Sequence, residues 1–137
     1  MSIKINIENL IEGESYDRKV LAKMWGYKGT MALERGAVTP KNDNKIILFI
    51  TKTNFNSMYK YKNEFDGHCL EIDGQINHGN DMRLINSRKK EEKIYLFYRE
   101  NAGQTFIFHG EFILVKAEYK PLEETSKFTF LKTKSNQ

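Results

Sequence analysis

The sequence predicts an α+β domain in which short N-terminal helices precede a small curved sheet or β-barrel of five to six strands. Helical spacing of apolar residues is confined to roughly the first 36 residues. After residue 40 the chain consists of short runs rich in aromatic and β-branched residues, separated by turn formers. A chain of 137 residues with 39% hydrophobic residues is sufficient for one domain with its own core. We therefore expect helices packed at one end of a single sheet.

Two helical segments are predicted before the sheet. The first lies within residues 15–26, with Ser15 as the N-cap and Gly26 at its end. The second is a helical turn over residues 30–36, capped by Thr30. The apolar face of the first helix is expected to hold Val20, Leu21, Met24 and Trp25.

The strands follow from residue 44 onward. Five consecutive apolar residues, Ile46–Ile50, indicate a strand that is covered on both faces. The pair His109–Gly110 is expected to form a turn between two strands, and residues 68–74 form a shorter, weaker one. The expected strands span residues 44–52, 68–74, 93–100, 104–110, 111–119 and 126–133.

Charge is unevenly distributed along the chain, whose net charge is only +4. Residues 41–62 carry a net charge of +4, residues 63–81 a net charge of −5 and residues 82–93 a net charge of +3. Two basic blocks therefore flank an acidic one and can form a positive face if the fold brings them together. Ordinary solvated surfaces explain the same pattern equally well.

Composition also limits the chemistry. Cys69 is the only cysteine, so no internal disulfide framework is expected, and one Cys with three His is too few for a structural zinc site. No export leader and no apolar run of membrane-spanning length is visible. We expect a cytoplasmic protein without cofactor, metal or membrane contact.

No catalytic motif is visible in the sequence. A restriction-type nuclease needs an acid-x-Lys element, but Asp66 is followed by Glu71 and Asp73, with aspartate at the lysine position. Nucleophile elbows, phosphate-binding glycine loops and HExxH are absent as well. His78 and Asp81 could form an acid/base pair, but such a pair in a Gly/Asn loop more often stabilises a turn. We therefore expect no enzymatic activity in this chain and assign no catalytic residue.

The segment from Ile76 to Ile85 is the first candidate for binding nucleic acid. It is read as a loop that places His78, Asn80 and Arg83 outward, while apolar residues anchor its end to the core. The guanidinium of Arg83 suits bidentate contact with phosphate or a guanine edge, and Asp81 could orient it. An Arg83–Asp81 surface pair without functional consequence is equally compatible with these residues.

Two further segments combine aromatic or small residues with basic ones. Tyr27 and Lys28 lie between glycines before a predicted helical turn, where backbone donors favour an anion. The glycines can equally well only end one helix and start the next. Residues 55–65 alternate aromatics with lysines, which suits base stacking beside phosphate contacts, although buried aromatics with lysines reaching to solvent explain this as well.

Six short blocks occur in the order WGYKG, RGAVTPK, IILFITK, HGNDMR, IYLFYRE and FIFHGEF. Over roughly residues 15 to 116 they make the chain resemble modification-reading domains fused to HNH endonucleases and to helicases of bacterial restriction systems. These are PUA-like or SRA-like modules, related in kind to sulfur-binding and modified-base-reading domains. The resemblance implies a β-barrel with flanking helices that binds duplex DNA carrying a phosphorothioate or a modified base, while cleavage belongs to another domain or subunit.

Under this resemblance the whole chain, residues 1–137, is one DNA-reader domain, which can belong to a longer parent protein. The basic residues would neutralise backbone phosphates, the 76–85 loop would read a base edge, and Tyr27, Thr39 and Pro40 would form an apolar lip for the sulfur or for a flipped base. The expected DNA-binding residues are Tyr27, Lys28, Arg35, Thr39, Pro40, Lys41, Lys52, His78, Asn80, Asp81, Arg83, Arg88 and Lys89.

This interpretation requires a particular arrangement of the basic side chains. The cations must converge around the 76–85 loop, and Arg83 must be accessible, so that Arg83→Ala weakens DNA binding by roughly 1 to 3 kcal/mol with little loss of stability. An enclosed Arg83 and cations on opposite sides of the molecule would end that argument. The alternatives are a barrel that recruits a protein partner or binds RNA.

Overall fold

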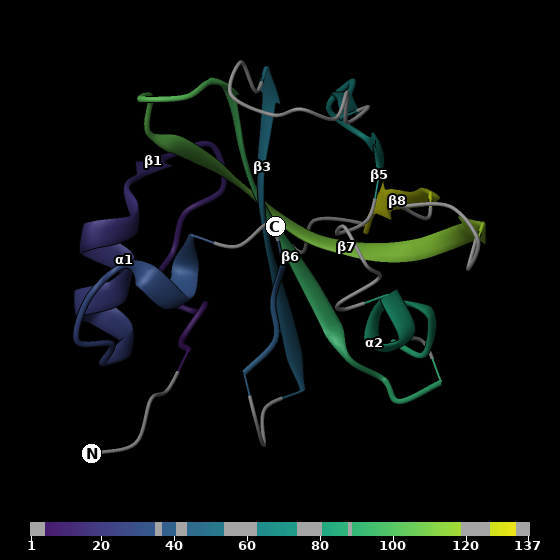
Figure 1. The fold of residues 1–137 in the computed structure, drawn as a ribbon, viewed down its shortest axis with the longest axis horizontal. Helices are drawn as coiled ribbons and strands as arrows, with labels where there is room; N and C mark the ends of the chain where they lie inside the picture. Colours follow the sequence, from purple (N-terminus) through teal and green to yellow (C-terminus); the bar gives the residue numbers. More distant parts are fainter. Residues whose placement is uncertain are drawn as a thin grey trace.

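Eight strands form one mixed sheet in the computed structural model (Figure 1). The structure describes residues 5–34, 37–40, 44–53, 63–73, 81–87, 89–118 and 127–133. Along the sheet the strand order is β2-β3-β6-β7-β8-β5-β4, and β1 pairs with β7 outside this path. The elements are β1 (Ser15–Tyr16), α1 (Arg18–Trp25), η1 (Met31–Leu33), β2 (Ala37–Val38), β3 (Lys45–Thr53), β4 (Glu64–Phe65), β5 (Cys69–Asp73), α2 (Asp81–Ile85), β6 (Lys93–Asn101), β7 (Phe106–Glu118) and β8 (Lys127–Lys132).

The expected class of an α+β domain with a curved sheet is confirmed, but the count of five to six strands is wrong. The additional members are the two-residue strands β1, β2 and β4, which are too short to leave an alternating pattern in the sequence. The sheet is open, because β2 and β4 lie at its two ends and do not pair with each other among the described residues.

Strand β3 lies inside the sheet and is buried on both faces, as its apolar run predicted. It pairs in parallel with β6 and in antiparallel with β2. Ile46, Leu48 and Ile50 face one cluster of buried side chains, which we call the inner core. Ile47 and Phe49 face a second cluster, the helix-side core, which also holds Leu21 and Trp25 of α1 and Leu33 of η1. In Figure 1, α1 lies to one side of the β3 and β6 pair and α2 to the other.

Helix α1 is shorter than predicted and begins two residues later. Asp17, not Ser15, is its N-cap, because an Asp17 carboxylate oxygen accepts a hydrogen bond of 2.8 Å from the backbone N–H of Val20. Ser15 is instead part of β1. Gly26 ends the helix in the left-handed conformation, with φ of 86°.

The buried face of α1 is also rotated from the predicted one. Leu21, Ala22 and Trp25 are buried, whereas Val20 and Met24 are exposed. The short helix offers several i, i+3 and i, i+4 sets, and the contact with the sheet selects one of them. The helical turn expected over 30–36 is the three-residue 3₁₀ helix η1, and its N-cap Thr30 makes no side-chain hydrogen bond to it.

The predicted turn at His109–Gly110 does not exist. Residues 106–118 form the single long strand β7, and the His–Gly pair is a β-bulge within it. Leu96 of β6 pairs with Gly110 and Phe97 pairs with Phe108, so His109 is the extra residue. Gly110 has φ of 85°, a conformation that glycine adopts readily. The residue pair that suggested a reversal of the chain therefore bends a continuous strand.

No described helix is long and apolar enough to span a membrane.

Candidate nucleic-acid interface

An open groove of about 730 Å³ lies at the end of the sheet where β6 passes into β7. Its volume is within the range of about 300 to 1,000 Å³ that is typical of ligand sites. Its lining is mixed and includes both aromatic rings and polar groups from the β6–β7 connection. Its lining includes Phe65, Tyr98, Arg99, Glu100, Gln104 and His109.

Three rings form the aromatic part of the groove. The centroid of the Phe65 ring lies 4.7 Å from that of His109, with a nearly perpendicular interplanar angle of 70°, and 5.0 Å from that of Tyr98. The rings of Tyr98 and His109 are 6.3 Å apart. The two contacts of His109 are edge-to-face and the Phe65–Tyr98 contact is tilted, and both arrangements are favourable for aromatic rings.

A tight turn after β4 positions Phe65. One carboxylate oxygen of Asp66 accepts hydrogen bonds from the backbone N–H groups of His68, at 2.9 Å, and Cys69, at 2.7 Å. These bonds favour the ionised form and hold the pKa of Asp66 below its ordinary value. Gly67 in this turn has φ of 102°, a conformation that glycine adopts readily. The turn is therefore determined by Asp66 and Gly67, which are neighbours in the sequence.

The bulge positions His109. At Gly110 a side chain would meet the carboxylate of Glu12, because a Cβ built there lies 2.7 Å from its carboxyl carbon. The same carboxylate forms an ion pair of 2.7 Å with Lys132 on β8. The pair closes over the bulge, and His109 is left on the groove side of β7.

The pKa shifts of His109 and Tyr98 favour the neutral forms of both side chains. Burial lowers the pKa of His109, Lys132 lowers it further, and Glu12 opposes this. Burial raises the pKa of the Tyr98 hydroxyl, and the nearby Glu100 adds to that rise. The groove therefore offers a neutral imidazole and a protonated phenol, each of which can donate and accept hydrogen bonds.

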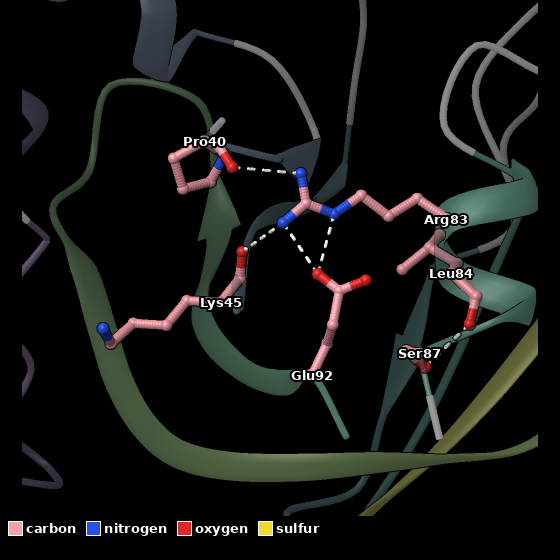
Figure 2. Close-up of polar contacts among 6 residues, drawn as sticks. All are labelled: Pro40, Lys45, Arg83, Leu84, Ser87 and Glu92. Carbon is pink, nitrogen blue, oxygen red and sulfur yellow. Dashed lines mark hydrogen bonds and ion pairs between the residues drawn. The ribbon is translucent and has the colours of Figure 1, made fainter. Parts of the chain in front are cut away.

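Arg83 is enclosed by the protein, which contradicts its expected role as an outward loop residue (Figure 2). It lies on α2, and its Nε and Nη2 approach one oxygen of Glu92 at 2.9 and 2.7 Å. Nη1 donates to the Pro40 carbonyl at 3.2 Å, and Nη2 donates to the Lys45 carbonyl at 3.1 Å. Only 23% of the Arg83 side chain and 9% of the Glu92 side chain are exposed.

Glu92 holds this arginine in the described part of the chain, whereas the expected contact with the Asp81 side chain lies outside it. The outward loop placement on which the DNA-reading role of Arg83 was based is wrong. Its terminal nitrogens tie α2 to the chain after β2 and to the start of β3. The expected anchoring of this segment is confirmed, because Leu84 is buried in the inner core and Ile85 packs against it.

The other expected site residues are placed as follows. Tyr27 is half-buried against the helix-side core, Lys28 and Lys89 are exposed, and Thr39 and Pro40 are half-buried after β2. Lys52 is exposed and lies 3.7 Å from a carboxylate oxygen of Glu100. Asp81 begins α2, while the positions outside the described residues are Arg35, Lys41, His78, Asn80 and Arg88, together with most of the aromatic and lysine segment 55–65.

Sequence reasoning missed the groove residues Tyr98 and His109 and the arginines Arg18 and Arg99, whereas Phe65 belongs to the segment 55–65 that was singled out for base stacking. Tyr98 and His109 sit in runs that read as ordinary strand, and Phe65 stands in a two-residue strand. The His–Gly pair inside an aromatic run was the available signal, because an isolated glycine within a strand also indicates a bulge.

Comparison with solved structures defines the fold. The SRA domain of SUVH5 bound to fully hydroxymethylated CG DNA matches with a TM-score of 0.67 at 11% identity, over 99% of this chain and 97% of that chain. The chain has an SRA-like fold. The same domain in complexes with methylated CHH DNA and hemi-methylated CG DNA matches with TM-scores of 0.65 and 0.66, at 12% identity and the same coverage. No family model and no curated protein sequence matches the chain.

The SRA-like fold agrees with the PUA-like or SRA-like architecture that the sequence blocks implied. Because the match covers nearly the full length of both chains, it includes the N-terminal helices as well as the sheet. At 11% to 12% identity it defines the fold and assigns no residue a role.

Proposed function

We propose that this chain is a DNA-binding module that recognises duplex DNA carrying a modified base. The observation that carries the proposal is the full-length likeness to SRA domains whose structures hold methylated or hydroxymethylated DNA. The DNA in these structures is methylated or hydroxymethylated. We therefore favour a modified base over a phosphorothioate as the recognised mark, a choice that the sequence resemblance left open.

The groove supports this proposal by its chemistry. A base inside a duplex is stacked on both sides, so a protein that inspects it in a pocket must first move it out of the stack. The ring surface formed by Phe65, Tyr98 and His109 can receive a planar base. The Tyr98 hydroxyl, the His109 imidazole and the Gln104 amide supply hydrogen-bonding groups for its edge.

We further propose that the module contributes recognition and not cleavage, as part of a restriction or defence system. The absence of nuclease motifs in the sequence and the resemblance to reader domains of HNH endonucleases support this division. The nuclease would be a further domain or a separate subunit. Incubation of the purified chain with modified duplex and Mg²⁺ should leave the DNA intact, and release of cleavage products would contradict this part of the proposal.

The direct test is fluorescence anisotropy with a set of matched duplexes. They share one sequence and are unmodified, methylated, hydroxymethylated or phosphorothioated, with a matched RNA duplex as competitor. We expect the tightest binding to a base-modified DNA duplex. If four or five phosphates are contacted, log affinity should fall with log salt concentration with a slope of about −4.

Other binding preferences would indicate other functions for this chain. Preference for the phosphorothioate duplex would replace the base by the backbone as the recognised mark. Preference for RNA would indicate the RNA-binding alternative, and absence of binding to every nucleic acid would leave the protein-interaction alternative. His109→Ala tests the groove directly, because it should reduce the preference for modified over unmodified DNA while the salt slope stays the same.

A further inference from the structure

Two arginines from distant parts of the chain converge on one aromatic ring on the helix side of the sheet. The guanidinium carbon of Arg18, in the first turn of α1, lies 4.7 Å from the centroid of the Phe106 ring. The guanidinium carbon of Arg99, near the end of β6, lies 4.3 Å from the same centroid. Because both distances are measured to the same centroid, the two guanidinium groups lie close together, and the charge of Arg99 acts on that of Arg18.

Each guanidinium is fixed by hydrogen bonds to the protein through part of its donor set. Arg18 donates from Nε to the carbonyl of Leu33 at 2.8 Å. Arg99 donates from Nε to the hydroxyl of Thr51 at 2.8 Å and from Nη1 to the carbonyl of Gln104 at 3.0 Å. A guanidinium has five N–H donors, so each arginine is held in place with most of its donors still available.

Neither arginine has a carboxylate partner within the part of the chain that the structure describes. Among the described residues no carboxylate forms an ion pair with Arg18 or Arg99. Burial lowers the pKa of Arg18, the Arg99 charge lowers it further, and Glu34 acts in the opposite sense without reaching ion-pair distance. Burial also lowers the pKa of Arg99. Two partly buried like charges in contact with one ring cost free energy unless an anion joins them.

Arg83 shows how the same chain treats an arginine whose role is structural. Its guanidinium is matched by the Glu92 carboxylate and by two backbone carbonyls. The Arg18 and Arg99 pair has carbonyl and hydroxyl acceptors but lacks such a carboxylate. The difference indicates that the missing negative charge comes from a ligand.

We propose that Arg18 and Arg99 form a phosphate-binding site. Side chains alternate between the two faces of a strand, so Arg99 points to the helix side while its neighbour Tyr98 points to the inner core and the groove. Arg99 also lines the groove, so the phosphate site adjoins the groove at the same end of β6. The site stands on this geometry without the proposed function; if the chain binds DNA, a backbone phosphate of the bound strand is the expected ligand.

The first test uses inorganic phosphate as the probe and thermal unfolding of the full chain as the readout. Phosphate should raise the melting temperature of the wild type above its value in chloride at equal ionic strength, and the rise should grow with phosphate concentration. Arg18→Gln and Arg99→Gln should lose this rise. Lys116→Gln removes an exposed lysine of β7 that pairs with Glu118, so it serves as the control and should keep the rise.

Two results would overturn the proposal: a wild type that responds alike to phosphate and chloride, or glutamine variants that keep the full response. Should a glutamine variant fail to fold, Arg99→Lys retains the charge, and the site requires it to keep part of the phosphate response.

The second test identifies the source of the phosphate. With duplex DNA, Arg18→Gln and Arg99→Gln should each reduce the salt slope by about 1, while Lys116→Gln should leave it unchanged. An unchanged slope in variants that have lost the phosphate response would assign the site to a small phosphate ester, with a nucleoside monophosphate as the probe. A phosphate response in a chain that binds no DNA would support the site and contradict the proposed function, so the two failures are distinguishable.

Discussion

Replacing Arg83 by alanine should destabilise the fold, whereas the sequence predicted an effect on DNA binding with little loss of stability. The structure reverses this expectation because the guanidinium is the meeting point of three chain segments. It pairs with Glu92 at 2.7 Å, and it donates to the carbonyls of Pro40 and Lys45. The sequence separations of these two carbonyl contacts are 43 and 38 residues, so the side chain connects parts of the fold that local structure does not hold together.

The magnitude follows from what alanine leaves behind. With 23% of Arg83 and 9% of Glu92 exposed, the pair is largely shielded from water. Breaking a buried ion pair by removing one partner costs about 3–5 kcal/mol, mainly because the other charge stays buried without a partner. Each lost hydrogen bond from a charged donor is worth about 1.5–3 kcal/mol on its own, but the carbonyls can recover part of this from water. We therefore expect the free energy of unfolding to fall by about 3–5 kcal/mol.

Urea denaturation followed by circular dichroism measures this change. Lys89→Ala removes an exposed cation from the turn after α2, so it should change the free energy of unfolding by less than about 0.5 kcal/mol. The double variant Arg83→Met with Glu92→Leu removes both charges, so it should be less destabilised than Arg83→Ala alone. A stability of Arg83→Ala within about 1 kcal/mol of the wild type would refute the reasoning, as would a double variant that is the less stable of the two.

Three further predictions concern local features of the fold. The pKa of His109 is lowered in the folded state, so its contribution to the free energy of unfolding is fully present above the unfolded pKa of about 6.5 and is lost as the pH falls through the folded pKa. His109→Gln should therefore flatten the loss of stability in thermal melts recorded between pH 7 and 5. An equally steep loss in the variant would assign the pH dependence to another group. Gly110→Ala should cost about 1–3 kcal/mol, and more than Gly103→Ala, since both have positive φ but only Gly110 has a side chain in the space of the new methyl group. Equal losses would contradict the close contact at the bulge. Asp17→Ala should lower the free energy of unfolding by about 0.5–2 kcal/mol in urea titrations, whereas Ser15→Ala should have little effect if Asp17 is the cap of α1.

The predictions that succeeded depend on neighbours in the sequence. The five apolar residues Ile46–Ile50 can be buried on both faces only inside a covered sheet, and β3 has that position. Gly26 ends α1 because its backbone conformation is a local property. The order of helices before strands is likewise set by local periodicity, which is why the general class of the fold was predictable.

The bulge at His109–Gly110 required the partner strand. A His–Gly pair between aromatic runs suits a hairpin turn and a bulge equally well, and the choice is made by the register with β6. The face of α1 was likewise decided by the sheet, which selected Leu21 and Trp25 over Val20 and Met24. In both cases local preference allowed several solutions, and burial of apolar surface chose one.

The sequence by itself determined the class of fold, the buried central strand and the residue types available for a basic, aromatic surface. Only the tertiary structure decided that Arg83 is enclosed with Glu92 and that Arg18 and Arg99 share the ring of Phe106. The physical reason is that hydrophobic periodicity is a property of neighbouring residues, whereas the partner of a charge depends on contacts between residues far apart in the chain. The sequence therefore shows that an arginine can form ion pairs and hydrogen bonds, and the fold decides whether its partner is another residue or a ligand.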